Sequence, residues 1–394
     1  MRFDSTPYYH VGEPYYAMGW DALMSEVRQE ARLIEEAGFT TMWFAEHHFA
    51  WDGYYNAAPN PLLVAGDLIP RTKTLRFGAL GTALPDRHPI HVAEDVAMLD
   101  LMSEGRMEFG VMRGANNRAC IQFHPSADRR NKAVNYRLFA ECLEIIVKAW
   151  TEDAFTHDGE FYTFPAPGWR ETVKDITDAS PLHFAGDGEM VALGLHPKPY
   201  QKPHPPIWQM ADALDSHVFA GERGMNVMCY SPPVATIKER WTAYREAARA
   251  SGRELEYGEN LAVMKPCFVV RRMDDEALAA ARAGTNFLFD RSPLAKVGRH
   301  IYIGEGERLT AEDKSDDWFD FLRRNGHLWV GTPDFVEEKI EELESELNCG
   351  HVGLFLNIPG LSFRQVMDSL ALFGEQVMPR FERPAPPVGA RVAG

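Results

Sequence analysis

The stretch from Leu75 to Gly114, LRFGALGTALPDRHPIHVAEDVAMLDLMSEGRMEFGVMRG, decides the fold of this chain. An apolar run at Thr74–Leu84 is followed by Pro89–Met102, where apolar side chains recur at helical spacing (Val92, Val96 and Leu99). A second apolar run, Arg106–Arg113, comes directly after this helix. A strand, a helix and a strand in immediate succession are typical of a parallel βαβ unit, so the stretch predicts an α/β fold.

The same alternation extends to both sides of this stretch. Toward the N-terminus we expect strands at Arg2–Tyr9 and Thr40–Ala45, and helices from the cap Asp21 to Gly38 and at Asn60–Pro70. Toward the C-terminus we expect strands at Ile207–Met210, Asn226–Tyr230, Leu261–Val270 and His351–Ile358. Eight strands separated mostly by helices predict a single (β/α)₈ TIM barrel with two insertions and a C-terminal helix.

The two insertions are expected at about residues 152–205 and 285–328. A helix at Ala133–Trp150 precedes the first, whose many prolines exclude one regular element, and the second is expected to be irregular. Further helices are expected at about Asp215–Gly224, Val234–Ser251 and Asp274–Gly284. Another helix is expected to begin at Pro333, with Thr332 as its cap. A terminal helix is expected to begin with the capping box of Ser362 and Gln365 and to end just before Pro379. Residues 1–380 are thus interpreted as one barrel domain and residues 381–394 as a C-terminal tail.

The composition describes an ordinary globular chain with an acidic balance. Of the 394 residues, 45% are hydrophobic and 25% charged, and 41 Lys and Arg against 57 Asp and Glu give a net charge of −16, which argues against a nucleic-acid partner. The five cysteines form no C-x-x-C pair, which favours reduced thiols in the cytoplasm. No signal peptide or apolar run of about 18 residues is present, so no membrane association is expected.

Active sites of such barrels lie at the C-terminal ends of the strands, where the second strand is followed by Glu46, His47 and His48. Histidine is the usual proton carrier near neutral pH, so His47 and His48 are candidates for proton transfer. Packing or hydrogen bonding is an equally good interpretation of either histidine. A joint metal site is disfavoured because no H-x-H or H-x-x-x-H pair is present.

Three other strand ends carry candidate binding residues. The small, apolar segment around Gly78–Pro85 suits a flat aromatic ring, although glycines that taper a barrel interior explain it equally. Arg113 and Arg137 could grip a phosphate, or they could form surface ion pairs. The start of the helix near Asp215 could bind an anion, unless Asp215 or Ser216 only caps it. No P-loop or Rossmann glycine motif is present.

Five segments together resemble the bacterial luciferase-like family of flavin-dependent monooxygenases, and most of all the catalytic α subunit of luciferase. They are EEAGFTTMWFAEHHF (35–49), the opening stretch (75–114), ADALDSHVFAGERG (211–224), VGTPDFVEEKI (330–340) and LALFGEQVMP (370–379). They occur in the family's order across nearly the whole chain.

The resemblance implies an FMN site and the residues that form it. His47 matches the family's catalytic histidine, and Leu80 and Gly81 match a non-proline cis peptide beneath the flavin ring. Met112 stands where luciferase has a cysteine facing the flavin, and Arg113 and Arg137 resemble the arginines that grip the phosphate. Asp212, Ala213 and Ser216 match the loop and helix start around the phosphate, although luciferase has a serine in place of Ala213. The stretch 285–328 occupies the position of the family's mobile lid but matches it poorly.

The family implies a two-component enzyme that receives reduced FMN from a separate flavin reductase. With O₂ the reduced FMN would form a peroxyflavin that inserts one oxygen atom into a small organic substrate, with His47 as proton carrier. Aromatic residues that could line an apolar substrate pocket are Phe3, Tyr8, Tyr9, Trp51, Tyr54, Tyr55, Trp169 and Trp208. An aldehyde, a cyclic ketone or an aromatic ring would each suit such a pocket.

Two alternatives and a dimer follow from the same resemblance. A deazaflavin-dependent dehydrogenase on the same barrel would transfer hydride without oxygen, and a non-catalytic subunit like the luciferase β chain would not turn over. The family implies a homodimer or a luciferase-like heterodimer, and we expect the dimer face near the helix Pro89–Met102.

Overall fold

A closed ring of parallel strands forms the centre of the computed structural model, which describes residues 1–7, 20–49, 59–114, 117–230, 232–273, 276–291, 298–304, 306–358 and 360–381. The ring strands are β1 (Arg2–Ser5), β2 (Thr41–Phe44), β3 (Arg76–Ala79), β5 (Met107–Met112), β8 (Ile207–Met210), β9 (Asn226–Cys229), β10 (Leu261–Val269) and β12 (His351–Phe355). They are ordered β10-β12-β1-β2-β3-β5-β8-β9, and β9 also pairs with β10. The prediction of a single (β/α)₈ barrel is confirmed.

Helices alternate with these strands as expected. They are α1 (Trp20–Glu36), α2 (Pro61–Leu68), α3 (Pro89–Met102), α4 (Asn117–Phe123), α5 (Lys132–Thr151), α7 (Leu214–Arg223), α8 (Val234–Ala250), α9 (Glu276–Arg291), α13 (Pro333–Leu347) and α14 (Phe363–Leu372). The predicted bounds of α3 and β8 agree with the structure to the residue. Because α1 already begins at Trp20, Asp21 lies in its first turn rather than at the cap.

The chain divides into two compact units. One consists of described residues from 1–8, 13–41 and 211–394, and is called unit 1 here; the other consists of described residues from 9–12 and 42–210, and is called unit 2. The boundary at residue 380 between barrel and tail stays a prediction, because residues 382–394 lie outside the described part. Within the described residues, no helix is both long and apolar enough to span a membrane.

The core of unit 2 is built around Trp43. A Cβ atom on Gly78 would lie 2.3 Å from the Trp43 ring, and the Trp208 ring packs edge-on at 5.6 Å. Glu108 is buried below them and accepts hydrogen bonds from Arg76 Nε and Trp208 Nε1, each at 2.7 Å. Gly78 therefore makes room for a core tryptophan, which supports the packing interpretation of this glycine.

The core of unit 1 has a polar and an apolar side around β1. Asp4 is buried, accepts a hydrogen bond from Arg2 Nε at 3.1 Å, and lies 2.7 Å from His351 Nε2. The neighbouring Phe3 points the other way, since side chains alternate along a strand. Its ring packs against those of Phe373 at 5.2 Å and Phe381 at 6.1 Å.

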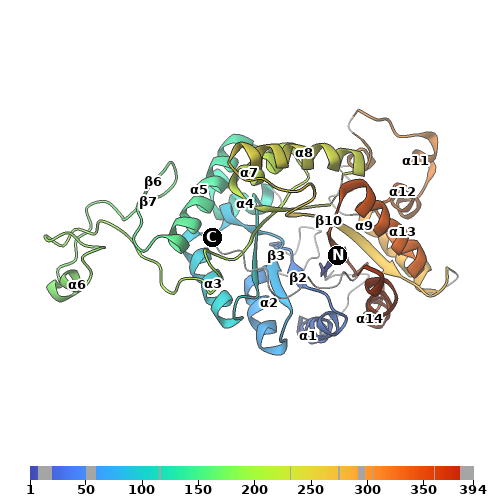
Figure 1. The fold of residues 1–394 in the computed structure, drawn as a ribbon, viewed down its shortest axis with the longest axis horizontal. Helices are drawn as coiled ribbons and strands as arrows, with labels where there is room; N and C mark the ends of the chain where they lie inside the picture. The colour runs from blue at the N-terminus through green and yellow to red at the C-terminus, as the bar shows by residue number, and fades with distance from the viewer. Residues whose placement is uncertain are drawn as a thin grey trace. The chain divides into compact units, whose positions relative to one another are not determined.

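The first insertion is an arm of unit 2 and contains only short elements, as its prolines predicted. These are β6 (His157–Asp158), β7 (Thr163–Phe164) and α6 (Lys174–Ala179), which extend away from α3 and α5 (Figure 1). The base of the arm is closed by backbone hydrogen bonds in both directions between Phe155 and Leu193, at 2.8 and 2.9 Å. Large apolar side chains are exposed on it, namely Trp169, Val173, Ile176, Leu182 and Val191.

The second insertion is not irregular, so that prediction was wrong. Helix α9 continues to Arg291, and the short helices α11 (Ala311–Ser315) and α12 (Trp318–Arg324) follow in the described part of the insertion. Arg282 on α9 binds Asp317 at 2.7 Å and Asp320 at 2.6 Å, and Phe289 stacks on Trp318 at 5.1 Å. These ion pairs and rings hold α12 against α9, a tertiary effect that sequence periodicity does not reveal.

Two short strands were not predicted as separate elements. β4 (Thr82–Ala83) continues the predicted strand after a break at residues 80–81, and β11 (Trp329–Gly331) pairs with the end of β10. The predicted capping box of Ser362 and Gln365 is confirmed. Beyond α14 the chain continues as a π-helix and a 3₁₀-helix to Phe381, and thus runs past Pro379.

Candidate active site

The end of β2 in unit 2 carries a network centred on Glu46. Its carboxylate is buried, and one oxygen, Oε1, contacts both His48 Nε2 at 2.8 Å and Arg87 Nε at 3.1 Å. Arg87 also donates to the backbone oxygen of Pro59 at 3.2 Å. The network fixes the loop that holds His47. The described residues contain no group of three His, Cys, Asp or Glu side chains that could hold a metal ion.

His47 is neutral at physiological pH in this environment. Burial, together with a smaller effect of the neighbouring His48, lowers the pKa of His47 to about 4. A neutral imidazole can accept a proton or share a hydrogen bond, but at pH 7 it does not carry the additional proton of an imidazolium ion. The position therefore suits a group that takes up a proton during a reaction.

Asp86 is a site residue that the sequence analysis missed. It ends the short 3₁₀ turn Leu84–Asp86 that follows β4, directly before Arg87. The pKa of Asp86 is raised to about 6, mainly by burial and to a smaller extent by Glu46. A hydrogen bond with Cys120 and the groups of His48 and Arg87 act in the opposite direction. Gly114 has a φ of 101° at this point, and a Cβ there would lie 2.3 Å from Cys120 Sγ, so only glycine fits. The sequence feature that could have identified Asp86 is an acidic residue two positions after the end of the predicted strand Thr74–Leu84.

Two aromatic rings flank His48. Phe49 and Phe123 stack at 5.8 Å with 21° between their planes, and the His48 ring meets Phe123 edge-on at 4.7 Å. Phe49 is 40% exposed and Phe123 43%, which provides an apolar wall beside the network. Phe49 also has a φ of 68°, which is rare for a residue with a bulky side chain.

The aromatic residues proposed from the sequence lie elsewhere or outside the described residues. Phe3 and Trp208 are core residues, so their assignment to a pocket was wrong, and Trp169 lies exposed on the arm. Tyr8, Tyr9, Trp51, Tyr54 and Tyr55 lie outside the described residues.

Leu80, Gly81 and Met112 lie on neighbouring strand ends. The peptide bond between Leu80 and Gly81 is cis, as the resemblance implied. A Cβ on Gly81 would lie 2.6 Å from the backbone of Val111, so this close approach requires glycine. Met112 is paired with Ala83 in the adjoining β4–β5 ladder and is partly exposed. The structure therefore brings together these three predicted residues.

The two predicted phosphate ligands, Arg113 and Arg137, have different neighbours. The Arg113 guanidinium lies 5.3 Å from the Tyr136 ring, and Asn135 Nδ2 donates to the Arg113 carbonyl at 3.1 Å, so Arg113 lies against the first half of α5. Arg137 instead binds Glu160 of the arm through Nε at 2.6 Å and Nη2 at 3.0 Å. Glu160 occupies the two-donor fork of Arg137 that a phosphate would use.

The remaining predicted residues, Asp212, Ala213 and Ser216, belong to unit 1. Asp212 Oδ1 accepts a hydrogen bond from the backbone N–H of Tyr230 at 2.7 Å, which orders the loop before α7. Ala213 is the N-cap residue of α7, and no side chain caps this helix. Neither Asp215 nor Ser216 is therefore the cap. An uncapped helix start with a buried Ser216 suits a phosphate.

These residues fit FMN in their chemistry. In unit 2, the strand ends at Leu80–Gly81 and Met112 are apolar, and Arg113 follows Met112 directly. In unit 1, no side chain caps the start of α7. An apolar surface suits the flavin ring, and a guanidinium and free helix N–H groups suit its phosphate.

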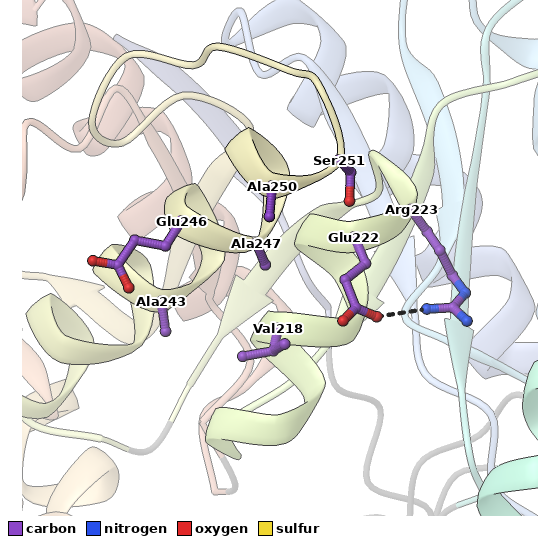
Figure 2. Close-up of a pocket in the computed structure, with 8 residues that line it drawn as sticks. All are labelled: Val218, Glu222, Arg223, Ala243, Glu246, Ala247, Ala250 and Ser251. Atoms are coloured by element: carbon purple, nitrogen blue, oxygen red, sulfur yellow. Dashed lines mark hydrogen bonds and ion pairs between the residues drawn. The ribbon is translucent and has the colours of Figure 1, made fainter.

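A surface pocket in unit 1 is separate from these residues. It lies between α7 and α8, where small side chains let the two helices approach closely, and Figure 2 shows Glu222 paired with Arg223 at its edge at 3.1 Å. Its lining consists of Val218, Glu222, Arg223, Ala243, Glu246, Ala247, Ala250 and Ser251. None of the predicted site residues is among them.

Known proteins resemble the chain over almost its full length. The family model described as luciferase-like monooxygenase matches residues 1–347. The oxygenase component of a flavin-dependent trigonelline monooxygenase from Acinetobacter baylyi is 31% identical over 363 residues, which cover 91% of this chain and 90% of that protein. An alkanal monooxygenase alpha chain from Photorhabdus luminescens is 25% identical over 377 residues, 91% of this chain and 92% of that one.

Solved structures share the fold. The oxygenating constituent of 3,6-diketocamphane monooxygenase from Pseudomonas putida, a structure in complex with FMN, has a TM-score of 0.72 at 22% identity and covers 98% of this chain and 100% of its own. An F420-dependent secondary alcohol dehydrogenase has a TM-score of 0.65 at 16% identity, covering 97% and 99%. Because the family model matches residues 1–347 of this chain, and a relative is 31% identical to it, the chain belongs to the luciferase-like monooxygenase family.

Proposed function

We propose that this protein is the oxygenase component of a two-component monooxygenase that uses reduced FMN and O₂ to insert one oxygen atom into a small, apolar organic substrate. The observation that carries the proposal is the position of His47 at the end of β2, next in the chain to Glu46 and His48 of the Glu46–His48–Arg87 network and to Phe49 of the apolar wall formed with Phe123. The names of two similar proteins support it. One is the oxygenase component of a flavin-dependent monooxygenase, and the other is a monooxygenase constituent solved in complex with FMN.

The candidate cofactor ligands are the residues that match the family. Leu80, Gly81 and Met112 would contact the ring, and Arg113, Ala213 and Ser216 the phosphate end. Arg137 joins the phosphate ligands only when Glu160 releases it, and Asp212 shapes the loop, because its Oδ1 already binds Tyr230 N–H. Bound reduced FMN would supply the electrons and the site of reaction with O₂.

The chain's own residues would control protons and water. His47 is neutral and can accept a proton at the strand end, and its loop is fixed through His48 and Arg87. Phe49 and Phe123 present apolar surface that excludes water and contacts the substrate. The same wall suits an aldehyde, a cyclic ketone or an aromatic ring.

The proposal includes partners and a compartment. A separate flavin reductase would deliver the reduced FMN, in line with the name of the relative that is an oxygenase component. A homodimer or a luciferase-like heterodimer would form through α3, whose Met98 and Met102 are 46% and 55% exposed. The five cysteines are buried and none of them forms a disulfide, which suits a reducing cytoplasm.

The test is the substitution His47→Ala, with His300→Ala, an exposed histidine on the 3₁₀ turn Arg299–Tyr302, as the matched control. Loss of a positioned proton carrier typically lowers the rate about 10²- to 10⁴-fold, so we expect substrate oxygenation to fall by about this factor while reduced FMN still binds. The control should retain full activity. Unchanged oxygenation in His47→Ala, with FMN bound, would refute the role of His47.

A further inference from the structure

A lysine is buried in the core of unit 1. Lys265 lies in the middle of β10, paired in register with Leu354 of β12, and is only 2% exposed. Within the described residues, its Nζ atom contacts His327 Nδ1 at 3.5 Å and forms no ion pair with a carboxylate. Buried ammonium ions are normally paired, because an unpaired charge removed from water destabilises the folded state. Lys265 is therefore held where its charged form is penalised.

His327 joins this lysine to the second insertion. Its Nε2 atom lies 2.7 Å from the backbone oxygen of Tyr302, and because a carbonyl oxygen only accepts, Nε2 carries the hydrogen. Burial and, to a smaller extent, Lys265 lower the pKa of His327 to about 3, so the ring is neutral and Nδ1 accepts from Lys265 Nζ. Hydrogen bonds thus run from strand β10 through His327 to the 3₁₀ turn Arg299–Tyr302.

This 3₁₀ turn is itself packed against the helices of the insertion. The Tyr302 ring meets the rings of Phe289 on α9 and Trp318 on α12 edge-on, at 6.0 and 6.4 Å. The backbone N–H of His327 donates to the carbonyl of Leu322 on α12 at 2.8 Å. The contact between the lysine and His327 is therefore a point at which the packed insertion is attached to a barrel strand.

We propose that Lys265 is a proton-controlled switch for the second insertion: its neutral amine allows the insertion to dock through His327, and its ammonium form favours release of the insertion. The physical reason is that the ammonium is hydrated only when the insertion moves away from the strand. This inference concerns the chain without cofactor, so it goes beyond the proposed function and does not depend on it.

The direction of the pH dependence follows from the surroundings of Lys265. Burial lowers the pKa of Lys265 from 10.5 to about 8, whereas Cys229 on β9, Asp212 before α7 and Cys349 before β12 act in the opposite direction. With the insertion released, the hydrated lysine should titrate near its ordinary value of 10.5. The docked form binds the proton less tightly, so docking becomes more favourable as the pH rises through 8 toward 10.5. For these two values, the equilibrium constant for opening falls about tenfold between pH 7 and pH 9.

Hydrogen exchange of the cofactor-free, full-length protein measures this opening, as protection factors corrected for the intrinsic exchange rate at each pH. At pH 7 we expect residues 298–304 and α12 to be less protected than β12, because the insertion opens without unfolding of the barrel. Their protection in the wild type should rise about tenfold from pH 7 to pH 9.

Two variants and a matched control assign the effect to this contact. Lys265→Met retains an unbranched side chain without the charge, so residues 298–304 should already show at pH 7 at least the protection that the wild type reaches at pH 9, with no further rise. His327→Leu removes both hydrogen bonds and should lower this protection at both pH values. Lys314→Met removes the same charge from an exposed position on α11 and should behave as the wild type.

Three results would overturn the inference. Equal protection of residues 298–304 and β12 at pH 7 would show that the insertion opens only when the whole fold does. A wild type without the rise between pH 7 and pH 9, or a Lys265→Met variant that keeps it, would show that Lys265 is not the switch. Unchanged protection in His327→Leu would show that the insertion does not dock through His327, and this result decides the question even if Lys265→Met does not fold.

Discussion

At the scale of the residue, the site is defined by which side chain binds which neighbour. Glu46 Oε1 contacts both His48 Nε2 and Arg87 Nε, and His47 takes part in neither of these two contacts. Because burial lowers the pKa of His47 to about 4 from 6.5, the folded protein binds its proton less tightly than the unfolded chain. His47 therefore stabilises the fold above about pH 6.5, and this contribution is lost as the pH falls through 4.

The phosphate ligands can be distinguished by three substitutions. Arg113→Gln should weaken FMN binding about 10- to 100-fold, since a hydrogen bond to a charged group is worth about 1.5–3 kcal/mol. Arg137→Gln should weaken it as well, whereas Glu160→Gln should strengthen it about threefold, because it releases Arg137 from an exposed ion pair. Isothermal titration with FMN measures all three. If Glu160→Gln and Arg137→Gln both leave the Kd unchanged, Arg137 serves only to hold the arm.

The sequence predicted some site residues and could not predict others. His47, Met112 and Arg113 directly follow or end strands, and barrel topology alone makes such positions candidates. Phe123 and Cys120 lie on α4, and their proximity to His48 and Asp86 depends on how this helix packs. The engagement of Arg137 by Glu160 joins residues of α5 and the arm, a contact that no local pattern encodes.

At the scale of the element, the hairpin β6–β7 is held by one side chain of α5. The Glu141 carboxylate accepts hydrogen bonds from the backbone N–H groups of Glu160 at 3.0 Å, Phe161 at 3.0 Å and Tyr162 at 2.8 Å, and lies 3.2 Å from His157 Nε2. Gly159 is required beside it, because a Cβ there would lie 2.3 Å from Glu141 Oε1. This carboxylate therefore links the arm to the barrel.

We expect Glu141→Gln to destabilise the protein by about 1–3 kcal/mol, since its amide group would face backbone donors. Urea unfolding measures the loss as a lower midpoint, and hydrogen exchange of residues 160–162 should accelerate. Glu144→Gln is the matched control, because Glu144 is exposed on the same helix and pairs with Lys148 at 2.8 Å. Equal stability of Glu141→Gln and the wild type would show that the hairpin does not depend on this contact.

The elements that the sequence predicted well are long and strongly periodic. Helix α3 and strand β8 match their predicted bounds, because proline and apolar spacing mark them locally. Strand β11 has three residues, too few for an alternating pattern, and α12 is held against α9 by Arg282. Short elements that depend on tertiary contacts were the ones missed.

At the scale of the whole molecule, the predicted cofactor residues are divided between the two compact units. His47, Leu80, Gly81, Met112, Arg113 and Arg137 belong to unit 2, and Asp212, Ala213 and Ser216 to unit 1. Unit 2 holds the predicted ring contacts and the arginines, and unit 1 holds the uncapped start of α7. We propose both sets as cofactor ligands, and the titration described next tests that proposal.

The central claim is that the chain binds reduced FMN and uses it to react with O₂. The most direct measurement is an anaerobic titration of the purified protein with reduced FMN, followed by rapid mixing with O₂ while absorbance is recorded. We predict saturable binding and then a transient spectrum distinct from those of free reduced and free oxidised FMN. Absence of binding, or oxidation at the rate of free reduced FMN without a distinct spectrum, would contradict the account.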